Sequence, residues 1–242
     1  IYYEDIEKLF LFSKNKPMFR YDFGQYRDVD GVTQIPPDGT QTGLELFYPN
    51  IPQSNFSKIP GSPIAFWISD NYISTFSDNI NLDRKLEIKQ GLATGNNDQF
   101  LRFWFEIDKS KSYLYCPSLE NAHKSLKKWF PYNKGGGFRK WYGNQDFFIA
   151  FDYENYSILK NQGNHLPSKQ YYFRESITWS DVSSGSFACR YSPLGFIFDV
   201  KGSSGFTDED LFYKIAFLNS IFASSTLYVL NPTLSYQVGN IK

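Results

Sequence analysis

The chain has 242 residues, a length that permits one large domain or two small ones, and we expect one folded domain preceded by irregular chain. Its 25 Lys and Arg residues balance its 25 Asp and Glu residues, which excludes a protein that is basic throughout. With two cysteines, two histidines and no CxxC motif, it offers neither a disulfide framework nor the ligands of a structural zinc site, which favours a reduced, cytoplasmic setting.

The two ends of the chain carry no membrane or export signal. The first residues, IYYEDIEKLF, contain neither an initiating methionine nor the features of a secretory signal peptide, so we expect a fragment of a longer protein. Residues 211–230 are largely apolar, but Lys214, Asn219 and three consecutive hydroxyl residues interrupt them. Such groups are costly in hydrocarbon, so this stretch predicts a buried helical region and no membrane partner.

The first quarter of the chain is punctuated by proline and glycine. We expect residues 1–60 to be an irregular lead-in and residues 61–242 to form the folded domain. Ser62 is typical of a helix N-cap and Pro63 of a first helical turn. Apolar residues then recur at a spacing of three to four, which predicts a helix over 63–77.

Beyond Lys85 the pattern changes from helical to alternating. KLEIKQG (85–91) and FLRFWFEI (100–107) predict two strands around the loop GLATGNNDQ (91–99), with at least one of Trp104 and Phe105 in the core. Further strands are predicted at 146–151, 176–179, 186–191 and 195–200, separated by turns rich in Ser, Gly and Pro.

The C-terminal quarter has a helical pattern. Thr207 and Asp210 form a capping box, so a helix should begin near Asp208, and helical structure should extend to about Leu230. Asn231 and a following proline should end it. Helices that flank mixed, mostly antiparallel strands predict an α+β fold.

Motifs for catalysis are missing. The sequence contains no GxSxG elbow, no HExxH motif and no GxxxxGK[ST] phosphate loop. The acidic run 208–210 is explained by its place at the start of a helix. We therefore expect no catalytic residue and no metal site in this chain.

One segment combines positive charge, aromatic rings and glycine. LKKWFPYNKGGGFRKWYGN (126–144) holds five cations and no carboxylate. Cations hold phosphates, aromatic rings stack on bases or fix a loop, and glycines let a backbone approach a partner closely. The pattern predicts a cationic loop that lies against a polyanion, while the residues alone leave open a structural loop whose tryptophans are core.

This segment resembles one found in adenine-specific DNA methyltransferases of the BREX phage-defence type, the PglX family, which are similar to type IIG restriction-modification enzymes. Four further stretches resemble the same family in the same order, at residues 59–69, 91–106, 175–204 and 218–242. Residues 1–58 match it less distinctly. The resemblance implies a target-recognition-domain-like fold and a role in reading the DNA sequence beside a catalytic domain.

In that family the catalytic domain binds S-adenosylmethionine and methylates the N6 amine of a flipped adenine. Its motif is an Asn or Asp, two prolines and an aromatic residue; residues 35–38 read IPPD and residues 231–233 read NPT, so neither matches. The glycine-rich cofactor motif is also missing, so we expect no cofactor in this chain and S-adenosylmethionine in the parent enzyme. The expected partners are double-stranded DNA and the parent's own methyltransferase domain, and whether the parent also cleaves DNA stays open.

The cations of the 126–144 segment receive specific roles in this interpretation. We expect phosphate contacts from Lys127, Lys128, Lys134 and Lys140. Arg139, held between Phe138 and Trp141, should reach a guanine edge in the major groove.

Two other loops are candidate DNA contacts. Thr94, Asn96, Asn97 and Gln99 belong to TGNNDQ, where the amides can pair with adenine, although asparagine and glycine also occur in any tight turn. Ser183, Ser184 and Ser186, together with Trp179, form a third candidate edge.

Two alternatives stay open. Exposed aromatic residues at this density also suit a protein- or carbohydrate-binding module, whose affinity should respond little to salt. The other alternative is that the isolated domain binds DNA too weakly to detect without its catalytic half.

Overall fold

The computed structural model describes residues 18–21, 28–29, 32–33, 46–49, 53–65, 68–182, 186–231 and 235–241. Backbone contacts divide the chain into two compact units, Ile1–Asn79 and Ile80–Lys242. Most of the lead-in predicted for residues 1–60 lies outside the described residues, and the roles assigned to the two parts of the chain stay predictions.

The first unit contains short elements. Its strands pair antiparallel as β1 (Met18–Tyr21) with β4 (Leu46–Pro49) and β2 (Asp28–Val29) with β3 (Val32–Thr33). A 3₁₀ turn, η1 (Gln53–Lys58), precedes the helix α2 (Asp70–Asp78).

Helix α2 begins later than the helix predicted over 63–77, so that start was wrong. An N-cap residue needs an extended backbone, whereas Ser62 has a φ of 48°, in the left-handed region. Ser69 has the extended backbone, and its Oγ accepts a hydrogen bond from the Tyr72 N–H at 3.3 Å. Two Ser-led cap signals lie close together here, and the structure uses the second.

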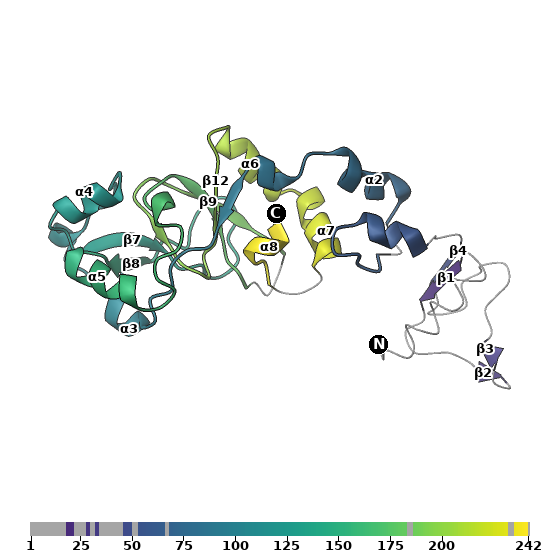
Figure 1. Ribbon diagram of the computed structural model, residues 1–242, viewed down its shortest axis with the longest axis horizontal. Helices are drawn as coiled ribbons and strands as arrows, with labels where there is room; N and C mark the ends of the chain where they lie inside the picture. The colour runs from purple at the N-terminus through teal and green to yellow at the C-terminus, as the bar shows by residue number, and fades with distance from the viewer. Residues whose placement is uncertain are drawn as a thin grey trace. The chain divides into compact units, whose positions relative to one another are not determined.

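The second unit contains two four-stranded sheets (Figure 1). The first sheet has the order β11 (Ile197–Phe198), β7 (Trp129–Asn133), β8 (Phe147–Ala150), β6 (Leu101–Phe103), with β11 and β7 parallel and the other pairs antiparallel. The second sheet is antiparallel throughout, in the order β10 (Cys189–Ser192), β9 (Ser176–Trp179), β12 (Ser204–Phe206), β5 (Glu87–Lys89). Together with the helices, these sheets confirm the predicted α+β class.

Helices and 3₁₀ turns of the second unit flank the sheets. The α-helices are α3 (Asn97–Phe100), α4 (Leu119–Lys124), α5 (Tyr153–Asn161), α6 (Leu211–Leu218), α7 (Ile221–Leu230) and α8 (Val238–Ile241). The 3₁₀ turns are η2 (Leu82–Arg84), η3 (Lys109–Lys111) and η4 (Lys169–Tyr171). Helix α6 packs against β9 and β10, and α8 packs against β5.

Each sheet has its own hydrophobic cluster. Phe130, Ile149 and Phe151 belong to the cluster of the first sheet, where Phe130 and Phe151 pack edge to face. Trp179 and Ile215 belong to the cluster of the second sheet, and the Trp179 indole donates to the Tyr236 carbonyl at 2.8 Å. The cluster of the first sheet is the richer of the two in aromatic residues.

The predicted C-terminal helix is two helices. Asp210 caps α6, with its Oδ1 accepting from the N–H groups of Phe212 and Tyr213, so the helix begins at Leu211 rather than near Asp208. A break at Asn219 and Ser220 separates α6 from α7, which ends at Leu230 as predicted. Across the part of the chain that the structure describes, no helix is both long enough and apolar enough to span a bilayer.

Most predicted strands are confirmed, with shifted ends. β5, β8, β9 and the two-residue β11 lie within the predicted ranges, whereas β10 begins three residues later and ends one residue later than predicted. The strand predicted over 100–107 is wrong beyond Phe103, because the chain turns there and the Glu106 N–H donates to the Phe103 carbonyl at 2.9 Å. Trp104 and Phe105 are therefore 49% and 65% exposed, and neither is core.

Gly91 marks a close backbone approach in the second unit. A Cβ at this position would lie 1.9 Å from the Phe198 carbonyl oxygen, where β11 passes. We expect Gly91→Ala to lower the free energy of unfolding by about 1–3 kcal/mol, the usual cost of forced overpacking. Gly137→Ala is the matched control, because a Cβ there meets nothing within 4 Å. Urea denaturation of both variants tests this, and equal stabilities would contradict it.

Candidate nucleic-acid interface

The 126–144 segment is a strand followed by a loop. β7 occupies Trp129–Asn133, and the rings of Phe130 and Tyr132 are fully buried in the first sheet. An extended chain advances about 3.3 Å per residue, so Lys128 and Lys134 lie roughly 20 Å apart along the strand. The expectation of one cationic loop is therefore corrected, because its charges divide between the two ends of β7.

At the start of β7 lies a group of four lysines, Lys109, Lys111, Lys127 and Lys128, which we call the lysine cluster. The Lys127 ammonium donates to the Ser110 carbonyl, and the Lys128 N–H donates to the Lys111 carbonyl at 2.9 Å. The ammonium of Lys128, an exposed residue, lies 5.4 Å from the Trp129 ring centroid. Sequence reasoning missed Lys109 and Lys111, although the two lysines of the KSK sequence were a usable signal.

At the end of β7 the three glycines serve different purposes. Gly135 has a φ of 87°, and a Cβ on it would lie 2.7 Å from the Lys201 carbonyl oxygen. Gly136 also has a positive φ, of 134°, whereas Gly137 has open space around it. The close approach that the sequence suggested for a partner is made, at Gly135, to the protein's own backbone.

The loop after the glycines exposes most of its side chains. Phe138 and Trp141 are about half exposed, at 52% and 54%, and Arg139 between them is exposed. Trp141 is held by its backbone, since its N–H donates to the Cys189 carbonyl at 3.0 Å and its carbonyl accepts from Tyr191 at 2.9 Å. The Lys140 ammonium instead points inward and donates to the Asn219 carbonyl at 2.9 Å.

Arg190 supports this loop from beneath. Its guanidinium is 1% exposed and donates to the Arg139 carbonyl at 3.5 Å and to the Ser180 hydroxyl at 3.3 Å. Burial lowers the pKa of Arg190 to about 10, so the group stays charged at neutral pH. Its Nε has no hydrogen-bond partner among the described residues.

The TGNNDQ loop is held by side chains from the turn that follows α5. Gln162 donates to the Thr94 carbonyl at 2.6 Å, and Asn164 both accepts from the Ala93 N–H and donates to the Gly91 carbonyl. Asn96 caps α3 by accepting from the Gln99 N–H at 3.2 Å. Asn96, Asn97 and Gln99 are exposed, and Thr94 is buried.

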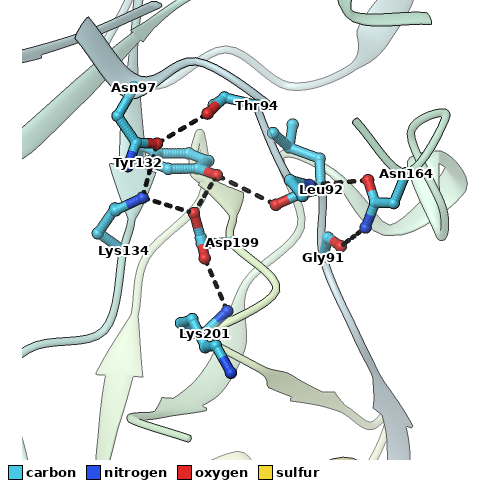
Figure 2. A network of polar contacts seen from close by, with 10 residues as sticks. Gly91, Leu92, Thr94, Asn97, Tyr132, Lys134, Asn164, Asp199 and Lys201 are labelled. Carbon is cyan, nitrogen blue, oxygen red and sulfur yellow. Dashed lines mark hydrogen bonds and ion pairs between the residues drawn. The ribbon is translucent and has the colours of Figure 1, made fainter. Parts of the chain in front are cut away.

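The structure brings these two predicted sites together, as Figure 2 shows. Asn97 Oδ1 lies 2.9 Å from the Lys134 ammonium and accepts from the Thr94 hydroxyl at 2.7 Å. The same ammonium lies 3.1 Å from Asp199 Oδ2. A side chain from the basic segment and one from the asparagine loop thus share a contact across 37 residues of sequence.

Asp199 is the centre of this arrangement. Its carboxylate is 3% exposed, with Oδ2 accepting from the Tyr132 hydroxyl at 2.7 Å and Oδ1 from the Lys201 N–H at 2.7 Å. Burial, and after it the negative charge of Asp199, raises the pKa of Tyr132 well above its ordinary value. Tyr132 is therefore a neutral, permanent donor to the carboxylate.

A cavity of about 300 Å³ opens beside these groups. Residues that line it include Thr94, Gly95, Asn97, Lys134, Asp199 and Lys201. The Lys201 ammonium lies 3.6 Å from Asp181, another buried carboxylate, whose pKa is raised by burial. Sequence reasoning missed Asp199, because a single aspartate after a strand has no motif.

The residues of the third predicted edge do not form one exposed surface. Ser183 and Ser184 lie outside the described residues, and Ser186 is exposed. Trp179 is fully buried in the core of the second sheet, so it does not belong to any surface edge. Over the ranges that the structure describes, no three His, Cys, Asp or Glu side chains are grouped as metal ligands.

Comparison with known proteins relates the chain to two bacterial methyltransferases. It is 41% identical over 201 residues to the adenine-specific methyltransferase PglX of Lacticaseibacillus casei (strain Zhang), a match covering 78% of this chain and 16% of that protein. It is 37% identical over 232 residues to the adenine-specific methyltransferase BrxX of Escherichia coli O9:H4 (strain HS), covering 94% of this chain and 18% of that protein. No family model matches the chain.

The chain is thus homologous to a small segment of the PglX and BrxX methyltransferases, spanning less than a fifth of either one.

We expect Tyr132→Phe to lower the free energy of unfolding by about 1.5–3 kcal/mol, the range for a hydrogen bond to a charged group. The substitution leaves the ring in the core but deprives the buried Asp199 of a donor. Tyr115→Phe, on a 69% exposed side chain, is the control and should change stability by less than about 0.5 kcal/mol. Denaturant titration gives both numbers, and an unchanged Tyr132→Phe would show that the carboxylate does not depend on this hydroxyl.

Proposed function

We propose that this chain is the DNA-reading part of an adenine-specific DNA methyltransferase of the PglX and BrxX kind. The homology with adenine-specific methyltransferases supports a role directed at DNA. The chain itself has a surface with hydrogen-bond donors and cations. The observation that carries the proposal is the contact between Asn97 and Lys134, which joins two independently predicted DNA contacts at one cavity.

The proposed phosphate grip rests on cations that the fold leaves available. The lysine cluster lies at one end of β7, and Arg139 projects beyond the other end. One turn of B-DNA is about 34 Å long, so a single duplex can contact both ends of the strand. Such contacts fix the position of the protein on the duplex without reading its sequence.

Lys134 and Lys140 receive a revised role. Lys134 is neutralised by Asp199, and Lys140 is bound to the Asn219 carbonyl. Their first role is to hold the loop, and they are less suited to a non-specific grip than the exposed members of the lysine cluster, Lys109, Lys111 and Lys128. Lys127 resembles Lys140, because it is half-buried and its ammonium donates to the Ser110 carbonyl. Phe138 and Trp141, both about half exposed, lie near Arg139 in the sequence.

The remaining candidate contacts keep their predicted roles within this proposal. Asn96 and Gln99 are exposed beside the cavity loop and available to a duplex. Ser183 and Ser184 stay predictions, since they lie outside the described residues.

In this proposal the chemistry belongs to the parent enzyme. An adenine in a duplex must be swung out of the stack before its amine is methylated, and a separate surface must grip the duplex meanwhile. The methyl donor, S-adenosylmethionine, would bind the parent's catalytic domain. This chain carries no motif for that cofactor.

The alternative, a protein- or carbohydrate-binding module, is favoured by one observation. Phe103, Trp104 and Phe105 form an exposed group in which the rings of Phe103 and Phe105 stack at 5.3 Å and 4°. Such a surface suits a sugar ring or an apolar partner. Salt separates the two functions, because a stacking site responds little to ionic strength.

We expect the triple variant Lys111→Gln, Lys128→Gln, Arg139→Gln, which removes three exposed cations, to weaken binding of the chain to a duplex of mixed sequence. Removing one phosphate contact should reduce the slope of log K against log salt by about 0.9, so the three substitutions together should reduce it by up to roughly 2.7. Fluorescence anisotropy across about 50–200 mM salt measures it.

The matched control for this experiment removes the same charge elsewhere. Lys58→Gln, Arg84→Gln and Lys169→Gln change three exposed cations on other elements, so the net charge falls equally. If both triple variants lose affinity alike, the effect is one of net charge and the proposed surface is wrong. Binding without any salt dependence would favour the aromatic alternative.

A further inference from the structure

The cavity beside Asp199 offers hydrogen-bond donors and few free acceptors. Asp199 Oδ2 already accepts from Tyr132 and Lys134, and Oδ1 accepts from the Lys201 N–H. Asn97 Oδ1 accepts from both Thr94 and Lys134. A carbonyl oxygen has two lone pairs, so this one is filled.

The orientation of the Asn97 amide is fixed by its neighbour. A lysine ammonium can only donate, so the amide must turn its oxygen toward Lys134 and its nitrogen away. That nitrogen has no partner among the described residues, and Lys134 uses two of its three N–H groups on Asn97 and Asp199. Two neighbouring donors, Asn97 Nδ2 and the third N–H of Lys134, therefore stay available at the cavity (Figure 2).

The cavity has almost no net charge. Lys134 pairs with Asp199 and Lys201 with Asp181, and both carboxylates are 3% exposed. A phosphate entering here would meet two buried negative charges that already occupy the ammonium groups. A neutral ligand with adjacent acceptors avoids that repulsion.

We propose that Lys134 and Asn97 read the major-groove edge of a guanine, donating to its O6 and N7. This inference rests on the proposed function and goes beyond it, since it names the base and the two residues that select it. Guanine is the base whose major-groove edge offers two acceptors, O6 and N7. Adenine presents an N6 amine and cytosine an N4 amine, and each would place a donor against a donor.

The discrimination follows from the same inventory of donors and acceptors. A bidentate contact is worth about 1–3 kcal/mol against the wrong base, which corresponds to about 5- to 150-fold in affinity. The Asn97 side chain, although an asparagine, is unsuited to adenine here, because its oxygen is already used. Lys134 is a specificity-determining residue, held in place by Asp199.

In the first test, the full chain is mixed with a pool of randomised duplexes, and the duplexes that it binds are recovered and sequenced. The original chain should prefer guanine at one position of the selected motif by about 5- to 150-fold. Lys134→Met should lose that preference and keep the preferences at the other positions. The slope of log K against log salt for Lys134→Met should differ from that of the original chain by less than half of about 0.9, the change expected when one phosphate contact is lost.

The second test changes the preferred base. Asn97→Asp keeps an oxygen toward Lys134 and Thr94 but replaces the amide donor by an acceptor, so the site should now pair with the N6 amine and N7 of adenine. We expect this variant to switch the preference from guanine to adenine at that one position. A protein that had merely lost structure would not gain a new preference.

A chemical substitution in the DNA identifies the atom. Replacing the guanine by 7-deazaguanine removes the N7 acceptor, so it should weaken the original chain and have little further effect on Lys134→Met. Circular dichroism and thermal unfolding of each variant establish that the fold persists.

Each other outcome has a distinct meaning. If Lys134→Met weakens all sequences equally and lowers the salt slope by about 0.9, the cavity holds a phosphate and the guanine proposal is overturned. If Asn97→Asp leaves the selected base unchanged, the assignment of Asn97 is overturned. If the original chain retains no duplex at low salt, the proposed function itself fails.

Discussion

The second unit depends on the burial of the Asp199 carboxylate. A buried charge is costly unless it is paired and hydrogen-bonded, and this one collects a tyrosine hydroxyl, an ammonium and a backbone N–H. Those donors come from β7, from the loop that follows it and from the chain after β11. Satisfying one carboxylate therefore sets the position of Lys134, and Lys134 in turn orients the amide of Asn97.

Glycine makes this arrangement sterically possible. A Cβ at Gly135 would lie 2.7 Å from the Lys201 carbonyl oxygen, and one at Gly202 would lie 2.3 Å from the Asn133 carbonyl oxygen. The backbones on either side of Asp199 are thus closer than side chains would allow. The glycine run of the basic segment belongs in part to the fold, so its presence alone is weak support for a ligand.

The sequence revealed much of the secondary structure but little of the site's geometry. Local sequence signals predicted an element's end correctly where a single residue determines it, as Asn231 does after α7. They failed at β7, where Trp129–Asn133 forms a largely buried strand by pairing with β8 and with β11, which is distant in sequence. Periodicity likewise could not reveal that the chain turns after Phe103, where the Glu106 N–H donates to the Phe103 carbonyl. Asp199 went unnoticed because its partners Tyr132 and Lys134 are distant in sequence.

Separating the exposed cations from the neutral cavity has a physical consequence for recognition. Lys109, Lys111, Lys128 and Arg139 are exposed, so under the proposed function added salt should screen their attraction to DNA phosphates. The donors at the cavity are held by buried carboxylates, and a contact with an uncharged base edge releases no counterions. Salt should therefore reduce affinity for all duplexes alike while leaving the ratio between a cognate and a non-cognate site nearly constant. A surface in which the same lysines both gripped phosphates and read bases would lose the two properties together.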